Sequence, residues 1–84
     1  MKPIRLSQHA QQKMRDRGAT EQEVLEAIRE NPWEPAELGR MECRRDFKFG
    51  RDWKGRVYAT KQVRPIFVEQ AGDILVVTVY VYYF

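Results

Sequence analysis

The sequence predicts an α+β fold in the order β-α-α-β-β-β-β, with two N-terminal helices packed on an antiparallel twisted sheet. Two capped helical segments fill the first part of the chain, and from Arg40 onward the hydrophobic spacing changes to alternation. The chain has 84 residues, which is room for a single domain spanning residues 1–84. We therefore expect one layer of helices on one layer of sheet.

A short strand and a capped helix open the chain. Residues 4–6 alternate as strand residues do, and Ser7 is a good N-cap because its hydroxyl accepts a bond from an otherwise unpaired amide. The predicted first helix is Gln8–Arg17. Gly18 ends it, since glycine adopts the left-handed conformation without strain.

The second helix has equally clear boundaries. Thr20 and Glu23 form a capping box, in which each side chain satisfies an orphan amide of the other residue. The helix predicted from them is Glu21–Asn31, with one apolar face and one largely acidic face. Pro32 stops it, because proline disfavours helical geometry in the residue before it.

Four strands are predicted in the second half. Residues 40–49 alternate, except that Arg45 falls in the apolar register, and Gly50–Gly55 is expected to be a loop with Trp53 at its tip. Two short strands, Val57–Lys61 and Ile66–Glu69, are expected to follow, with Lys61 and Arg64 flanking the turn between them. Pro65 puts the second of these near an edge, because proline cannot donate a ladder bond. The last strand, Ile74–Tyr83, is apolar on both faces and is expected to be central.

The composition excludes several classes of site. There is one cysteine and one histidine, so an internal disulfide and a cysteine-rich zinc site are excluded, and we expect neither metal nor cofactor. The longest apolar stretch has 11 residues, too short for a membrane helix of about 20 residues. With no signal-peptide pattern at the N-terminus, the expected location is the cytoplasm, without membrane association.

Charge is unevenly distributed along the chain. Residues 19–38 carry six Glu against one Arg, whereas residues 39–64 carry nine Lys or Arg against three acidic residues. The molecule should therefore be polarised, with an acidic second helix and a basic remainder. A basic surface suits a polyanion such as RNA.

The first helix carries the main catalytic candidates. His9, Lys13 and Arg17 are spaced i, i+4 and i+8, so they share one helical face, and Arg5 on the preceding strand is expected to join it. A histidine among cations suits phosphodiester cleavage, which needs a proton acceptor and positive charge around the phosphate. The alternative is that His9 caps or packs the junction between strand and helix.

Further candidates lie in the sheet. Arg45 is either rotated out by a β-bulge or is a site residue, and Lys61 is either solvated or bound to substrate. Thr78, Tyr80 and Tyr82 share one face of the last strand, where aromatic rings can stack on RNA bases or simply pack the core. Cys43 has no activating partner in the sequence, so we interpret it as a small core residue.

Four segments together resemble the bacterial domain-of-unknown-function family 4258. They are Ser7-Gln8-His9-Ala10, Met14-Arg15-Asp16-Arg17-Gly18, Thr20-Glu21-Gln22-Glu23-Val24 and Val76-Val77-Thr78-Val79-Tyr80. Lys13 and Ala19 stand where the family usually has arginine and isoleucine. The family is similar in size and element order to the RelE/ParE toxin superfamily, so the resemblance implies a RelE-like fold.

The resemblance and the residues lead to one main hypothesis and two rivals. The main hypothesis is a metal-independent, toxin-like endoribonuclease, neutralised by an antitoxin protein. In it His9 acts as base, Arg17 and Lys13 hold phosphate, Tyr80 acts as acid or positioning group, and Arg5, Arg45, Lys61 and Thr78 bind substrate. The first rival is a non-catalytic module that binds nucleic acid or a protein strand at the edge near Pro65. The second is a homodimer formed through the apolar segment Val79–Phe84.

Overall fold

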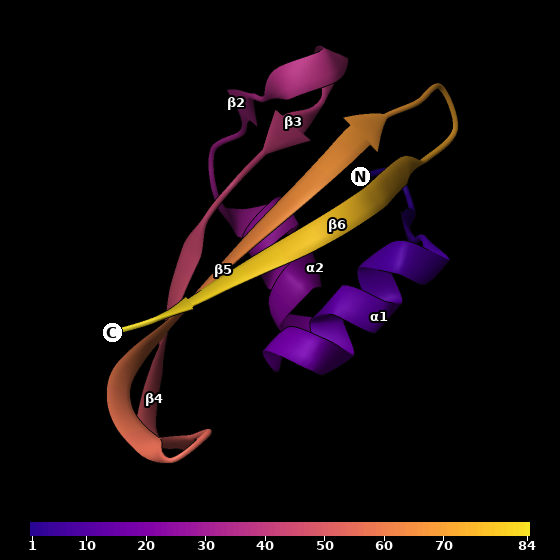
Figure 1. Cartoon of the computed structure of the whole chain (residues 1–84). Helices are drawn as coiled ribbons and strands as arrows, with labels where there is room; N and C mark the ends of the chain where they lie inside the picture. Colours follow the sequence, from indigo (N-terminus) through magenta and orange to yellow (C-terminus); the bar gives the residue numbers. More distant parts are fainter.

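Two helices lie on one face of a twisted sheet, and no helix covers the other face (Figure 1). The computed structural model describes all 84 residues. The elements, in chain order, are β1 (Ile4–Leu6), α1 (Gln8–Arg17), α2 (Glu21–Glu30), β2 (Glu34–Pro35), the 3-10 turn η1 (Glu37–Gly39), β3 (Met41–Glu42), β4 (Arg45–Trp53), β5 (Arg56–Glu69) and β6 (Ile74–Tyr83). The predicted α+β class, with both N-terminal helices on the sheet, is confirmed.

The sheet is mixed, whereas an antiparallel sheet was expected. Its strands lie in the order β1-β6-β5-β3-β2, and β4 also pairs with β5. The first strand runs parallel to the last, with Ile4 opposite Ile74 and Leu6 opposite Val76. After β1, the helices α1 and α2 carry the chain across one face of the sheet. This crossover allows β1 to run parallel to β6.

β5 is one long strand, and the prediction of two short strands joined by a turn that Lys61 and Arg64 flank is wrong. It runs unbroken for 14 residues between β6 on one side and β3 and β4 on the other, so Pro65 lies in the interior of the sheet and not near an edge. Proline fits there because β4 pairs up to Val63 and β3 pairs from Ile66. Pro65 therefore lies opposite the gap between β3 and β4. The missing N–H of proline removes fewer inter-strand hydrogen bonds there than it would beside a paired strand.

The helix ends follow the local sequence. The Ser7 hydroxyl accepts from the Ala10 N–H at 3.0 Å, and Gly18 has a φ of 81°. Both hydrogen bonds of the Thr20–Glu23 capping box are present. The second helix ends at Glu30, one residue earlier than expected, with Asn31 as its extended C-cap.

The hairpin between β4 and β5 is tighter than the predicted loop. The strands continue to the pair Trp53–Arg56, and only Lys54 and Gly55 form the turn, with φ values of 52° and 90°. Two successive positive φ angles are those of a type I′ turn, whose twist matches that of the flanking strands. Trp53 is therefore in a strand, and its ring stacks on Tyr83 with centroids 4.9 Å apart.

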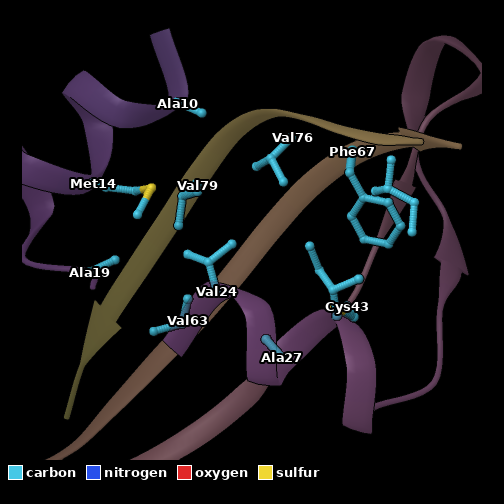
Figure 2. Packing of buried hydrophobic residues seen from close by; sticks show 12 residues of the cluster. Ala10, Met14, Ala19, Val24, Ala27, Cys43, Val63, Phe67, Val76 and Val79 are labelled. Carbon is cyan, nitrogen blue, oxygen red and sulfur yellow. The ribbon is translucent and has the colours of Figure 1, made fainter. Parts of the chain in front are cut away.

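The core lies between the helices and the sheet. Figure 2 shows side chains of α1 and α2 directed toward those of β5 and β6. Ala10 and Ala27 are fully buried, and their small size lets both helices approach the strands closely. Cys43 belongs to this cluster, as the sequence predicted, and burial raises the pKa of its thiol to about 12. The fold contains no helix with the length and apolar character needed to cross a membrane.

Candidate nucleic-acid interface

The face of the sheet that the helices leave uncovered carries a row of exposed aromatic rings. A bulge at Val77 changes the register of β6, so that Val76 and Val79 are both buried on the helix side. Side chains at alternate positions after the bulge then point to the opposite face. On that face Tyr80 is 39%, Tyr82 42% and Phe84 59% exposed, so three aromatic side chains are available to a partner.

Arg17 links the helix layer to this open face. Its Nη1 donates to the Val79 carbonyl at 2.8 Å, at the edge of β6 that β1 leaves free beyond Val76. Its guanidinium carbon lies 4.9 Å from the centroid of the Tyr80 ring. The carbonyl of Arg17 in turn accepts from the Tyr83 hydroxyl at 2.7 Å. These contacts hold a cation against an exposed aromatic ring.

Arg64 approaches Tyr80 from the neighbouring strand. The two residues are directly opposite in the β5–β6 ladder, and the Arg64 guanidinium carbon is 5.5 Å from the ring centroid. Its Nη1 donates to the Tyr82 hydroxyl at 3.1 Å, and its Nε donates to Glu42 Oε2. This hydrogen bond from Arg64 holds the pKa of Glu42 below its ordinary value and raises that of Arg64. Both groups therefore stay charged.

A groove of about 540 Å³ lies beside these residues. Ile66, Thr78 and Tyr80 from the two long strands line it together with Arg64 and Glu42. The segment from Pro35 to Leu38 and the side chain of Arg40 complete its lining. This volume lies within the range of ~300–1,000 Å³ that small-ligand sites span. The groove can therefore hold a group the size of one nucleotide.

The structure does not bring the candidates of the first helix together at this groove. His9 is exposed on the first turn of α1 and has no hydrogen-bond partner, whereas Tyr80 lies on the far face of the sheet. Eight residues separate His9 from Arg17, which is about 12 Å along a helix axis. Lys13 is half-buried on α1, and Arg5 is paired with Asp73 at the start of β6. Arg17 is the one residue of this set that contacts Tyr80.

Lys61 lies on the helix side of the sheet and does not line the groove. It is 3% exposed, and its Nζ donates to the Gly18 carbonyl at 2.8 Å and lies 2.9 Å from Glu23 Oε2. A solvated lysine beside a turn was one expected alternative, and a substrate-binding lysine was the other. The solvated alternative is wrong, because the unbroken β5 buries Lys61 on the helix side of the sheet. Lys61 instead lines a second cavity of about 320 Å³ together with Arg51, Trp53 and Tyr83. There it joins the C-terminus of α1 to the capping box of α2.

Arg45 also lies on the helix side. Its Nε is 3.9 Å from Glu26 Oε2, and its Nη1 lies 3.4 Å from Asn31 Oδ1. The strand thus keeps Arg45 in the apolar register, and α2 supplies its partners. The side chain faces the acidic helix and not the groove.

Sequence reasoning missed Arg64, Glu42 and Arg40 as members of the site. The sequence analysis places Arg64 beside a turn between two short strands, whereas the structure has one continuous strand there. The alternation of Gln62, Arg64 and Ile66 is the signal that places Arg64 opposite Tyr80, once residues 56–69 are treated as one strand. Glu42 could not be identified alone, since its role comes from pairing β3 with β5.

Comparisons with known proteins give no match: no family model, no curated protein and no solved structure matches the chain. No group of three or more His, Cys, Asp or Glu side chains is arranged to hold a metal ion. The likeness to family 4258 and to RelE/ParE toxins thus remains a prediction.

Proposed function

We propose that this protein binds single-stranded RNA on the open face of its sheet. The observation that carries the proposal is the exposed row of Tyr80, Tyr82 and Phe84, with Arg17 and Arg64 held against the Tyr80 ring. Aromatic rings stack on unpaired bases, and arginine adds both charge for the phosphates and cation–π attraction. A duplex keeps its bases stacked, so it cannot use such a row of rings.

The distribution of charge supports the same proposal. Arg40 and Arg64 line the groove together with Glu37 and Glu42, and Arg44 and Lys48 are exposed on the adjoining part of the chain. The acidic residues of α2 lie in the helix layer. The open side can therefore attract a polyanion without strong repulsion from the acidic helix. Binding of this kind weakens with added salt, because the bound RNA has released its counterions.

The proposal is tested with a labelled single-stranded RNA and fluorescence anisotropy. Tyr80→Ala should weaken binding by roughly 5- to 150-fold, the equivalent of one lost stacking contact of about 1–3 kcal/mol. Tyr80→Phe keeps the ring and should bind nearly as tightly as the wild type. Equal binding by the wild type and Tyr80→Ala would contradict the proposal.

A charge-matched pair of variants separates the site from general electrostatics. Arg64→Met and Arg29→Met each remove one positive charge, but Arg29 is exposed on α2, in the helix layer. Only Arg64→Met should weaken RNA binding strongly. Similar losses in both variants would mean that net charge, and not the open face, governs binding.

Metal-independent cleavage of the bound RNA is a second candidate function. It is favoured by the two guanidinium groups within 4.9 and 5.5 Å of one ring centroid, because a pair of cations can stabilise the charge that develops on a phosphate. The groove itself contains no histidine, and of its two carboxylates Glu42 is held by Arg64, whereas Glu37 is exposed. Binding is therefore better supported than cleavage.

Incubation of end-labelled RNA with the protein in EDTA tests the second candidate. Products that end in a 2′,3′-cyclic phosphate, lost in Arg17→Met and Arg64→Met, would assign cleavage to the surroundings of Tyr80 on the open face. Loss of cleavage in His9→Ala with full cleavage in Arg64→Met would place the reaction on α1, as first expected from the sequence. If the protein binds the RNA normally and the RNA stays intact, the protein binds RNA without cleaving it.

A further inference from the structure

The ion pair in the groove leaves hydrogen-bonding atoms free. Glu42 accepts from Arg64 through Oε2, and neither Glu42 Oε1 nor Arg64 Nη2 has a partner within the protein. The only buried side-chain nitrogen or oxygen without a partner is Arg45 Nε. The free atoms of Glu42 and Arg64 are therefore open to solvent, as is the unpaired guanidinium of Arg40 in the groove lining.

These free atoms have a fixed hydrogen-bonding character. An ionised carboxylate only accepts, and a guanidinium only donates. The hydrogen bond from Arg64 keeps the pKa of Glu42 low, so this side chain is an acceptor at neutral pH. A ligand for the groove must therefore offer donors to Glu42 and acceptors to the arginines beside it.

Among the RNA bases, guanine fits this pattern best. Its N1–H and N2–H₂ donors are adjacent and can both bond one carboxylate, and its O6 and N7 are acceptors that suit arginine. Adenine, cytosine and uracil each offer a single donor group on the corresponding edge. We propose that the groove recognises a guanine base of single-stranded RNA, with Glu42 accepting from N1 and N2 and Arg40 donating to O6 and N7.

The surroundings of the ion pair suit a single stacked base. Tyr80 lines the same groove and supplies an exposed ring, and Ile66 and Thr78 form the remaining strand surface. A base stacked on an aromatic ring keeps the hydrogen-bonding groups of its edges free, and Glu42, Arg64 and Arg40 line the same groove as Tyr80. This assignment rests on the proposed RNA binding and adds to it the identity of one base.

The test compares oligoadenylates that carry one central variable base. The RNA with central guanine should bind roughly 5- to 150-fold more tightly than the RNA with adenine, the discrimination of one bidentate contact. Inosine, which lacks only the N2 amino group, should lose much of this preference. These comparisons use the wild-type protein, so they do not depend on the folding of any variant.

Two variants then assign the preference to Glu42. Glu42→Gln places a donor beside the guanine donors and should bring guanine and adenine to similar affinities. Asp46→Asn is the matched control, since Asp46 lies in β4, is bonded to Gln62 and does not line the groove. This variant should keep the preference for guanine.

The possible outcomes separate the two proposals. If the wild type binds no RNA, the proposed function fails and the guanine site fails with it. If it binds all oligonucleotides equally through Tyr80, RNA binding stands and the guanine site is overturned. A guanine preference that survives in Glu42→Gln would equally overturn the assignment to this carboxylate.

Discussion

The hydroxyl oxygen of Tyr83 lies 2.5 Å from the position that a Cβ on Gly18 would take. The same missing side chain leaves room for the Trp53 ring, two of whose atoms lie 2.7 and 2.8 Å from that position. The C-terminus of α1 thus packs directly against the end of β6 and the hairpin of β4 and β5. Gly18 serves both as a left-handed helix cap and as a contact surface.

Gly18→Ala should therefore destabilise the protein strongly. A left-handed alanine costs about 1–2 kcal/mol, and overpacking against Tyr83 and Trp53 adds about 1–3 kcal/mol. Gly39→Ala is the control, because Gly39 has a φ of 72° but no atom within 4 Å of the added methyl group. Urea unfolding of both variants measures the difference, and equal losses would show that the ring contacts do not matter.

Lys61→Met should also lower the free energy of unfolding, by about 3–5 kcal/mol, because it leaves the Gly18 carbonyl and Glu23 without their buried cation. The double variant Lys61→Met with Glu23→Gln should recover part of this loss, since no uncompensated charge remains. Lys48→Met, in the exposed part of β4, is the control and should change little. Urea unfolding gives all three values, and a stable Lys61→Met variant would contradict the assigned role.

Glu42 should make the free energy of unfolding depend on pH in the acidic range. Its hydrogen bond to Arg64 lowers its folded-state pKa below the ordinary value of 4.5, so its contribution is fully present above that value. The contribution is lost as the pH falls through the lowered pKa, because the unfolded chain binds the proton more readily. Glu42→Gln should therefore flatten the acid limb of the curve of unfolding free energy against pH. Glu30→Gln, an exposed carboxylate without an ion pair, should leave the slope of that limb as in the wild type.

Leu38→Gly should stabilise the protein. Leu38 has a φ of 60° and is 84% exposed, so it carries left-handed strain and buries little apolar surface. Glycine removes about 1–2 kcal/mol of left-handed strain. Its larger conformational entropy in the unfolded chain costs about 0.4–1 kcal/mol of stability, so the free energy of unfolding should rise. Leu38→Ala keeps the strain and should show no gain. Thermal unfolding distinguishes the two variants.

Cys43 should be protected from thiol reagents in the folded protein. It is 2% exposed, and the raised pKa of its thiol keeps it protonated near neutral pH. Labelling with a chromogenic disulfide reagent should therefore follow the rate at which the protein opens, and should become fast in denaturant. Rapid labelling of the native protein would contradict the burial of Cys43.

The helices and their ends could be predicted because the signals are local. Ser7 and Gly18 bound the first helix, and the box of Thr20 and Glu23 begins the second, through contacts within three or four residues. The alternation of β6 likewise shows that Thr78, Tyr80 and Tyr82 share a face. Such patterns depend only on backbone geometry and on neighbours in the chain.

The site required the tertiary structure, because strand pairing joins residues that are distant in sequence. The proline at position 65 suggests a strand near an edge, yet β5 continues through it inside the sheet, since β3 and β4 leave a gap opposite. That continuity puts Lys61 in the core and Arg64 beside Tyr80. By itself the sequence determined the α+β class, where each helix begins, and the shared face of Thr78, Tyr80 and Tyr82. Only the register of β3, β5 and β6 decided which charged groups meet those rings, because one residue of slip moves every side chain to the other face.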